Sequence, residues 1–214
     1  MRPRTYWRPA QGEPTVTLLL RHGQTPMSVQ KRYAGRSDVP LTDVGVQQAA
    51  AAAKRLASAD LGVIVTSPLL RAVQTAQEVA SVTGAAVVTD DGFRETDFGA
   101  WEGLTFAEVR ERWPSEATTW LAGPDAAPPG GESFTDVSTR VTAALHRVLA
   151  DRDGQRVLIV SHVTPIKTLV AAALLAPPAA LFRMHLDVAA LCEIDWYADG
   201  PAVLRSFNDT GHLS

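Results

Sequence analysis

The chain has 214 residues, 46% of them hydrophobic and 20% charged, with a formal net charge of −3 at pH 7. This length suits one large α/β domain or two small ones, and the composition is ordinary for a globular protein. The slight negative charge argues against a general binder of nucleic acids or membrane surfaces, because such a protein would be strongly basic. No apolar stretch reaches membrane-spanning length.

The single cysteine indicates the expected redox compartment, and the N-terminal segment indicates where the domain begins. Cys192 excludes an internal disulfide and fits a reducing cytoplasm. It lies in an apolar run, so we expect a small buried residue and not a nucleophile. Residues 1–14 are polar, contain prolines and lack the apolar core of a signal peptide. We interpret them as an arm or a linker remnant, and residues 15–214 as one domain.

Strand-like apolar runs alternate with helical patterns, which predicts a mostly parallel sheet with helices on both faces. Up to residue 90 the predicted elements are a strand over 16–20, a helix over 44–56 with Thr42 as its N-cap, a strand over 61–66, a helix opened by Ser67-Pro68 and running to about 82, and a strand over 85–89.

The second half of the chain continues this alternation. Its predicted elements are a short helix over 104–113 that Pro114 interrupts, an irregular loop over 123–131, a helix over 133–150, a strand over 156–160, a helix that Thr164-Pro165 opens and that ends before Pro177, and an antiparallel strand pair over 190–196 and 203–207. The resulting fold is a three-layer α/β/α sandwich, mostly parallel, with an antiparallel edge.

The strand over 16–20 ends abruptly in Arg21-His22-Gly23. Open α/β sheets bind ligands at the carboxyl ends of their strands. An imidazole beside a guanidinium suits an anionic substrate, with the histidine available as nucleophile or acid/base. Gly23 is expected to let the chain turn sharply and a ligand approach closely. A strand end whose charged residues only meet solvent is the alternative at this point.

Three further segments place useful groups at equivalent positions. Arg71 falls in the first turn of a predicted helix that follows a strand, where its fork can hold two phosphate oxygens. His162 follows its strand as His22 does. Glu95 lies in a loop of acids and aromatics that can hold a carboxylate partly desolvated and prepare it as a proton donor. Together these residues favour a phosphate site over separate structural roles.

Other kinds of site find less support. Two histidines accompanied by two arginines would repel a cation, and no compact metal-ligand spacing is present, so we expect no metal and no cofactor. No glycine-rich nucleotide loop occurs, and no basic stripe or aromatic run supports independent nucleic-acid binding. His146, His185 and His212 are expected to be incidental.

At these positions the chain resembles the histidine phosphatase superfamily, also called the phosphoglycerate mutase-like family, from about residue 15 to the end. The matching residues are Arg21-His22-Gly23 for the family signature, Arg71 for the second phosphate arginine, Glu95 for the usual proton donor and His162 for the second histidine. Many members carry an asparagine six residues after the nucleophile. This chain has Ser28 there, whose hydroxyl can donate one hydrogen bond to phosphate.

The likeness is greatest to α-ribazole phosphatase-type members, and in particular to the C-terminal domain of actinobacterial bifunctional ribonuclease H/acid phosphatase proteins. The segments 98–103 and 129–133 carry it. The resemblance implies an acid phosphatase that hydrolyses a small-molecule phosphomonoester without a metal, and a fusion to or origin from a protein with a ribonuclease H domain. Residues 1–14 would then be the end of an interdomain linker.

The mechanism that the resemblance implies begins with neutral His22, which attacks phosphorus and forms a phosphohistidine. Arg21, Arg71 and His162 hold the equatorial oxygens, and Glu95 protonates the leaving alkoxide and then activates water. The two histidines are expected to be tuned in opposite directions, since His22 needs a free lone pair whereas His162 gains from a proton.

Two alternatives stay open, a phosphoglycerate mutase and a non-catalytic module that binds phosphorylated ligands. A mutase usually carries a lysine where Phe106 stands and an arginine pair further on, but residues 113–133 contain no arginine or lysine. This absence favours hydrolysis. A binding module usually lacks the nucleophile or the acid, and His22 and Glu95 are both present.

The leaving group is not identified by these motifs. Several aromatic residues are candidates either to line an apolar pocket or to pack in the core, namely Phe98, Trp101, Phe106, Trp113 and Trp120. Residues 123–131 are a candidate lid.

Overall fold

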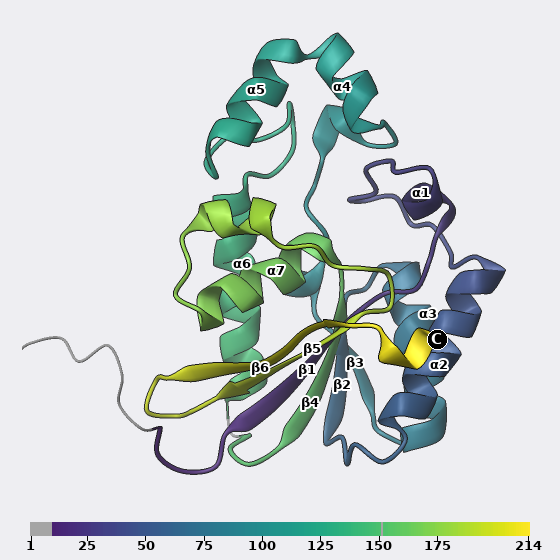
Figure 1. Ribbon diagram of the computed structural model, residues 1–214, viewed down its shortest axis with the longest axis vertical. Helices are drawn as coiled ribbons and strands as arrows, with labels where there is room; N and C mark the ends of the chain where they lie inside the picture. The colour runs from purple at the N-terminus through teal and green to yellow at the C-terminus, as the bar shows by residue number, and fades with distance from the viewer. Residues whose placement is uncertain (1–9, 151) are drawn as a thin grey trace, which may run out of the picture.

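The computed structural model describes residues 10–150 and 152–214. Its core is a six-stranded sheet with the strand order β3-β2-β4-β1-β5-β6 (Figure 1). In chain order the strands are β1 (Thr15–Arg21), β2 (Val63–Thr66), β3 (Val87–Thr89), β4 (Arg156–Ser161), β5 (Leu191–Trp196) and β6 (Ala202–Asp209). β1 pairs in parallel with β4 and antiparallel with β5. The predicted mostly parallel sheet with an antiparallel edge is confirmed.

The helices of the described residues connect and cover these strands. The α-helices are α1 (Pro26–Val29), α2 (Asp43–Leu56), α3 (Leu70–Thr83), α4 (Phe106–Arg112), α5 (Pro114–Ala122), α6 (Phe134–Leu149) and α7 (Val163–Ala173), and the 3₁₀ turns are η1 (Asp91–Phe93), η2 (Gly99–Trp101), η3 (Pro178–Arg183) and η4 (Gly211–Leu213). Thr42 caps α2 by accepting a hydrogen bond from the Gly45 N–H at 3.0 Å, as expected.

The three layers follow from the alternation of side chains along the strands. Leu18 and Leu20 of β1 join a buried cluster with α2 and α3, whereas Leu19 joins the cluster formed with α6 and α7. β4 divides in the same way, since Leu158 belongs to the first cluster and Ile159 to the second. The two central strands are therefore buried on both faces, which completes the α/β/α sandwich.

A third apolar cluster lies outside the sandwich. α4 and α5 stand apart from the sheet, beyond the ends of α6 and α7 (Figure 1). They pack with Phe98, Trp101, Phe134 and Leu181 from neighbouring segments. The sequence predicted a single short helix that ends at Pro114, and this prediction missed α5. The proline does not end the helical region. It occupies the first position of α5, where its missing N–H costs no hydrogen bond.

Two predicted helix starts are displaced. Ser67-Pro68 does not open α3, which begins at Leu70 with Leu69 as an N-cap that makes no side-chain capping bond. The Ser67 hydroxyl contacts the His162 ring and also accepts the Leu69 N–H at 3.3 Å, so its oxygen serves both the site and the turn that enters α3. α7 begins at Val163 and ends at Ala173, and a separate 3₁₀ turn follows from Pro178.

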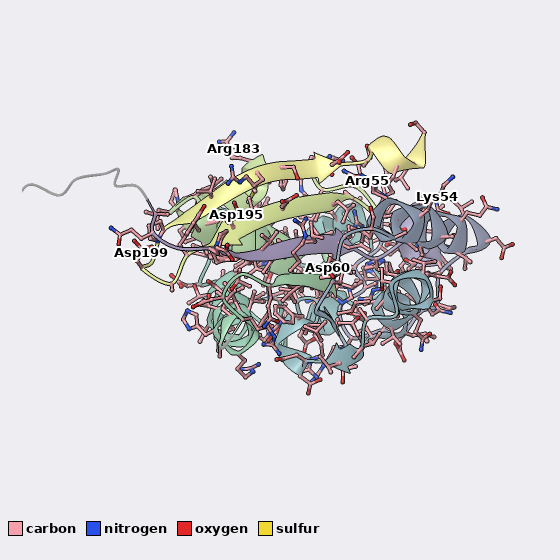
Figure 2. The ribbon with its side chains drawn as sticks, turned by 90° about the horizontal axis from the view of Figure 1, so that it is seen from below. Lys54, Arg55, Asp60, Arg183, Asp195 and Asp199 are labelled. Atoms are coloured by element: carbon pink, nitrogen blue, oxygen red, sulfur yellow. The ribbon has the colours of Figure 1, made fainter. Side chains whose placement is uncertain are left out.

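The antiparallel edge of the sheet carries ionic side chains. Asp195 lies on β5 (Figure 2), and Arg205 of the edge strand β6 donates to its Oδ2 at 2.6 Å. A charged edge discourages pairing with another sheet. Cys192 of β5 is buried, as expected, and burial raises the pKa of its thiol to about 11.

The described part of the chain contains no helix that is both long enough and apolar enough to cross a membrane. The interpretation of residues 1–14 as an arm falls largely on residues 1–9, which lie outside the described residues.

Replacement of a central core residue tests this architecture. Leu158 has no exposed surface, and Leu158→Ala is expected to lower the free energy of unfolding by about 2–5 kcal/mol, because the cavity cannot collapse between two layers. Urea unfolding measures this change. Leu175→Ala is the control, since that side chain is 94% exposed. Equal unfolding midpoints for the two variants would contradict the assigned burial.

Candidate active site

The pairing of β1 with β4 brings the two sequence-predicted histidines together. The register places Arg21 opposite Ser161, so the residues that follow each strand lie side by side. The His22 N–H donates to the Ser161 carbonyl at 3.0 Å, and the ring centroids of His22 and His162 are 5.1 Å apart. Neighbouring parallel strands thus end in a pair of imidazoles, as expected from two histidines that each directly follow a predicted strand.

The hydrogen bond of the His22 ring defines its tautomer. Nδ1 lies 2.7 Å from the Gly23 carbonyl oxygen, and a carbonyl oxygen can only accept. The proton therefore resides on Nδ1, and the lone pair of Nε2 is available to attack an electrophile. His22 also lines the cavity described below.

Gly23 serves the packing of this strand end. A Cβ atom at Gly23 would collide with the Gly45 carbonyl oxygen, and one at Gly45 would collide with the carbonyl of Gln24. The two glycines let the chain after His22 lie directly on the first turn of α2. Gly23 does not have a positive φ. The glycine is needed for this backbone contact, and the close approach of a ligand stays a prediction.

Arg21 and Arg71 bring buried positive charge to the site. The Arg21 Nη1 donates to the Leu186 carbonyl at 2.6 Å, and Arg71 donates to the carbonyls of Ser37 at 2.8 Å and Ala34 at 2.7 Å. Among the described residues, the buried Nε atoms of both arginines have no protein partner. Burial lowers the pKa of Arg21 to about 10, with Glu95 acting in the opposite direction.

No carboxylate within the described ranges lies within ion-pair distance of either arginine. Both guanidinium groups still carry their charge at neutral pH, so the site holds two cations that neutral carbonyls solvate only in part. An anion such as phosphate compensates such charges and can accept their remaining N–H groups. Arg21 and Arg71 line the same cavity as His22, and their binding of phosphate stays a prediction.

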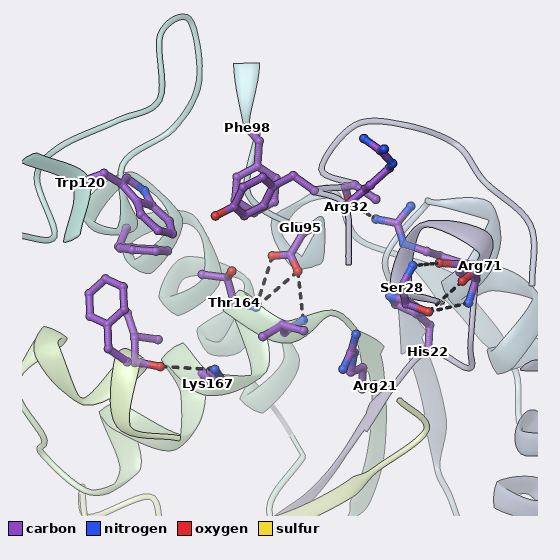
Figure 3. Close-up of a pocket in the computed structure, with 17 residues that line it drawn as sticks. Arg21, His22, Ser28, Arg32, Arg71, Glu95, Phe98, Trp120, Thr164 and Lys167 are labelled. Atoms are coloured by element: carbon purple, nitrogen blue, oxygen red, sulfur yellow. Dashed lines mark hydrogen bonds between the residues drawn. The ribbon is translucent and has the colours of Figure 1, made fainter. Parts of the chain in front are cut away.

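Glu95 is fixed at the N-terminus of α7. Its carboxylate accepts the Val163 N–H at 3.1 Å and the Thr164 N–H at 3.2 Å (Figure 3). It also accepts the Thr96 N–H at 2.9 Å. The first N–H groups of a helix have no partner within the helix, and here they orient the acid. Glu95 is 9% exposed, which agrees with the expected partial desolvation.

Arg140 of α6 holds the backbone that carries this acid. It donates to the Glu95 carbonyl at 2.9 Å and to the Arg94 carbonyl at 2.7 Å, and it pairs with Glu132 at 2.8 Å. Glu132 in turn accepts the Asp97 N–H at 2.9 Å. The contacts of Arg140 and Glu132 fix the loop on either side of Glu95, a role that the sequence did not reveal.

The pKa values of the two histidines are shifted in the same direction, and the opposite tuning around a phosphate stays a prediction. Burial lowers the pKa of His22 well below its usual value, and the charges of Arg71 and Arg21 lower it further. Burial and Arg71 lower the pKa of His162 as well. His162 has no exposed surface, and its Nε2 lies 2.7 Å from the Ser67 Oγ. Both imidazoles are neutral because burial and nearby arginines disfavour a further cation.

These residues surround a cavity of about 270 Å³. Figure 3 shows His22 and Arg71 on one side of Glu95, and Trp120 and Lys167 on the other. His162 lies behind His22 and is not among the lining residues. The cavity therefore has a cationic side and a side with aromatic rings, with the acid between them.

Ser28 lines the cavity, but its hydroxyl serves a local structure. The Ser28 Oγ donates to the Thr25 carbonyl at 2.8 Å and accepts the Thr25 N–H at 2.9 Å, which caps α1. The predicted hydrogen bond from Ser28 to phosphate would require its hydroxyl proton to leave the Thr25 carbonyl.

The aromatic candidates divide between the cavity and the core. Phe98 and Trp120 line the cavity, whereas the other three candidates belong only to the third apolar cluster: Trp101, Phe106 and Trp113. The candidate lid over 123–131 is irregular, as expected, but contributes no residue to the lining of this cavity. Its Pro129 carbonyl accepts the Ala100 N–H at 2.9 Å, which attaches the loop to η2.

Sequence reasoning missed several lining residues. Tyr33, Phe134 and Phe182 add three rings, and Lys167 adds an ammonium group. Lys167 follows Val163 by four residues, and residues with this spacing share one face of a helix. That spacing was the available signal, because Val163 follows His162 directly. Nothing in the local sequence marked Tyr33 or Phe182 as neighbours of His22.

In the described portion of the chain, no three His, Cys, Asp or Glu side chains are grouped so that they could hold a metal ion. The cationic side of the cavity presents nitrogen atoms of arginine and histidine side chains, which suit an anion.

The family model described as "Histidine phosphatase superfamily (branch 1)" matches residues 17–210. The chain belongs to this superfamily. It is 50% identical over 208 residues to "Bifunctional protein Rv2228c" of Mycobacterium tuberculosis, which covers 97% of this chain but only 57% of that protein. It is 35% identical over 202 residues to "Probable phosphoglycerate mutase GpmB" of Proteus mirabilis, which covers 92% of this chain and 94% of the relative.

Solved structures agree with this assignment. The native structure of mycobacterial glucosyl-3-phosphoglycerate phosphatase Rv2419c is similar with a TM-score of 0.82 and 31% identity, covering 92% of this chain and 99% of that one. A putative alpha-ribazole-5'-P phosphatase from Escherichia coli is similar with a TM-score of 0.84 and 27% identity, covering 92% and 97%. The predicted family and its fold are confirmed.

The lowered histidine pKa values predict how stability depends on pH. An unfolded histidine binds a proton near pH 6.5, whereas folded His22 and His162 resist protonation until a lower pH. The unfolded state therefore binds more protons below about pH 6.5, and the free energy of unfolding falls as the pH falls. Urea unfolding at pH 7.5 and 5.5 measures this fall, which is expected to be smaller in His162→Gln. An equal fall in that variant would contradict the assigned environment of His162.

Proposed function

We propose that this chain hydrolyses small-molecule phosphomonoesters through a phosphohistidine intermediate on His22. The observation that carries this proposal is the available Nε2 lone pair of His22, fixed by the Gly23 carbonyl, beside two arginines without ion-pair partners. The membership of the superfamily and the similarity to a solved phosphatase support it.

In the first step, the His22 Nε2 attacks phosphorus in line, and the P–O bond to the alcohol breaks as the N–P bond forms. Arg21 and Arg71 stabilise the charge on the equatorial oxygens, which in phosphoryl transfer supplies most of the catalysis. Glu95 gives its proton to the leaving alkoxide. The Nδ1–H bond to Gly23 keeps the ring oriented during the attack.

In the second step, water attacks the phosphohistidine and the N–P bond breaks. Glu95, now a carboxylate, takes a proton from that water, which frees inorganic phosphate and returns His22 to its starting state. His162 lies against the His22 ring at a centroid distance of 5.1 Å, where it restricts the motion of that ring. A direct contact of His162 with phosphate stays a prediction.

Phosphoglycerate mutase activity is the second candidate, because named mutases are among the relatives. A mutase needs further cations for a second acidic group. Arg32 lines the cavity but pairs with Glu108 at 2.8 Å, and Phe106, where mutases usually carry a lysine, packs in the third cluster. Lys167 is the remaining cation among the described lining residues. This distribution favours hydrolysis.

We further propose that the reaction needs no metal, since two guanidinium groups already balance the ester. The lowered pKa of His22 keeps its lone pair free at mildly acid pH, which supports an acid phosphatase. The α-ribazole 5'-phosphate ester is one candidate substrate. The fusion to a ribonuclease H domain and a place in the cytoplasm are proposals too, the first supported by the bifunctional relative and the second by the buried Cys192.

Replacement of the nucleophile tests the proposal. His22→Ala is expected to abolish both turnover of p-nitrophenyl phosphate and acid-labile phosphorylation of the protein, while wild-type turnover survives EDTA. Release of p-nitrophenolate and mass spectrometry of the quenched enzyme measure these outcomes. His146→Ala is the matched control, because His146 is exposed on α6. Full activity in His22→Ala would refute the proposed nucleophile.

The role of Glu95 is tested with two leaving groups. Glu95→Gln is expected to slow the phosphorylation of His22 by an alkyl phosphate about 10²–10⁴-fold. The same step with p-nitrophenyl phosphate should slow much less, since p-nitrophenolate leaves without a proton. Rapid-quench measurement of phosphorylated enzyme reports this step directly. An equal effect on both esters would show that Glu95 does not act as the acid.

A further inference from the structure

The side of the cavity opposite His22 is lined by aromatic rings from separate segments of the chain. We call these five residues the aromatic cluster: Tyr33, Phe98, Trp120, Phe134 and Phe182. They come from the loop after α1, the loop before η2, α5, α6 and η3. Only tertiary packing brings these segments together.

The rings of the aromatic cluster contact one another in edge-on and tilted geometries. Phe182 meets Trp120 and Phe134 edge-on, with centroid distances of 5.8 Å and 5.5 Å. Tyr33 and Phe98 form a tilted pair at 4.4 Å, and Tyr33 also meets Trp120 edge-on at 6.3 Å. Aromatic rings attract each other in edge-to-face and offset arrangements, so a ring bound in the cavity against this cluster finds favourable partners.

The exposure of Phe182 distinguishes it from the rings of the core. Its side chain is 43% exposed although it lines the cavity, whereas Trp101, in the same apolar cluster as Trp120, has no exposed surface. Folding leaves this large apolar side chain only partly buried, and exposed apolar surface at a cavity is typical of a ligand-binding site. A bound apolar group would cover it.

Charge on this side of the cavity is sparse. Lys167 donates to the Leu181 carbonyl at 3.3 Å, and Arg32 is held by Glu108. No carboxylate other than Glu95 lines the cavity in the described part of the chain. The body of a substrate therefore meets mainly carbon atoms and one ammonium group.

The position of Glu95 fixes the direction in which a substrate extends. Phosphorus must lie near the His22 Nε2, and the leaving oxygen must lie near Glu95. Trp120 lies beyond Glu95 as seen from His22 (Figure 3), so the alcohol of the ester points toward the aromatic cluster.

We propose that the aromatic cluster selects phosphomonoesters whose alcohol carries an aromatic ring, and that Phe182 determines this specificity. This inference rests on the proposed hydrolysis at His22 and names its substrate class. Binding of the ring buries apolar surface on both partners and adds ring-to-ring contacts. The expected preference comes from binding of the alcohol part of the ester and not from a faster chemical step.

A pair of matched esters separates recognition from leaving-group chemistry. 2-Phenylethyl phosphate and ethyl phosphate both release a primary alkanol, so Glu95 has the same task in each, and only the ring differs. The ratio of their kcat/KM values is expected to favour the phenyl ester about ten-fold or more in the wild-type enzyme. Phe182→Ala should reduce that ratio several-fold, because kcat/KM is expected to fall much more for the phenyl ester than for ethyl phosphate.

Two further variants complete the design. Phe182→Leu keeps an apolar side chain of similar size and is expected to lower the ratio, whereas Phe182→Tyr keeps the ring and is expected to preserve it. Leu121→Ala is the matched control, because Leu121 is 47% exposed and does not line the cavity. It should leave the ratio at its wild-type value.

Failure of the proposed specificity and failure of the proposed function would give different results. Equal kcat/KM values for the two esters, or an equal loss for both in Phe182→Ala, would overturn the proposed specificity while hydrolysis stands. Absence of turnover for both esters and for p-nitrophenyl phosphate, with no phosphorylation of His22, would overturn the proposed function and this inference with it.

Discussion

The pairing of β1 with β4 is the contact on which the rest of the site depends. Both strands are buried on both faces, so neither can shift by one residue without moving an entire row of leucine and isoleucine side chains to the wrong layer. That constraint fixes Arg21 opposite Ser161 and sets the two imidazoles 5.1 Å apart. The helix that follows β4 then presents its first N–H groups to Glu95. Core packing thus determines the geometry of the catalytic groups.

The electrostatic character of the site follows from burial without ion pairing. Arg21 and Arg71 are held by backbone carbonyls, which position a guanidinium group but do not neutralise it. The same burial and the same two charges keep the neighbouring histidines neutral. A cationic pocket with a neutral nucleophile is suited to a phosphate dianion, because binding of the anion compensates charge that the protein leaves unpaired. The net charge of −3 conceals this local arrangement.

The aromatic residues show how the same residue type serves two purposes in one cluster. Trp101 lies at 0% exposure, within a network of rings, and stabilises the segment formed by α4 and α5. Trp120 contacts Trp101 edge-on at 5.6 Å and also lines the cavity. The core therefore supports the rings that face a substrate. Rings held on such a packed layer have little freedom to lose when a ligand binds, which favours recognition.

The sequence alone determined the fold class and the positions of the proposed catalytic residues, because these depend on local patterns. Short apolar runs, helix caps and residues that directly follow a strand predicted the layered sheet and the positions of His22, Arg71, Glu95 and His162. Tertiary structure alone decided what those groups experience. The tautomer of His22, the neutral state of His162 and the aromatic cluster arise from contacts between segments far apart in the chain. Burial and hydrogen bonding across the fold set these properties, and no local pattern records them.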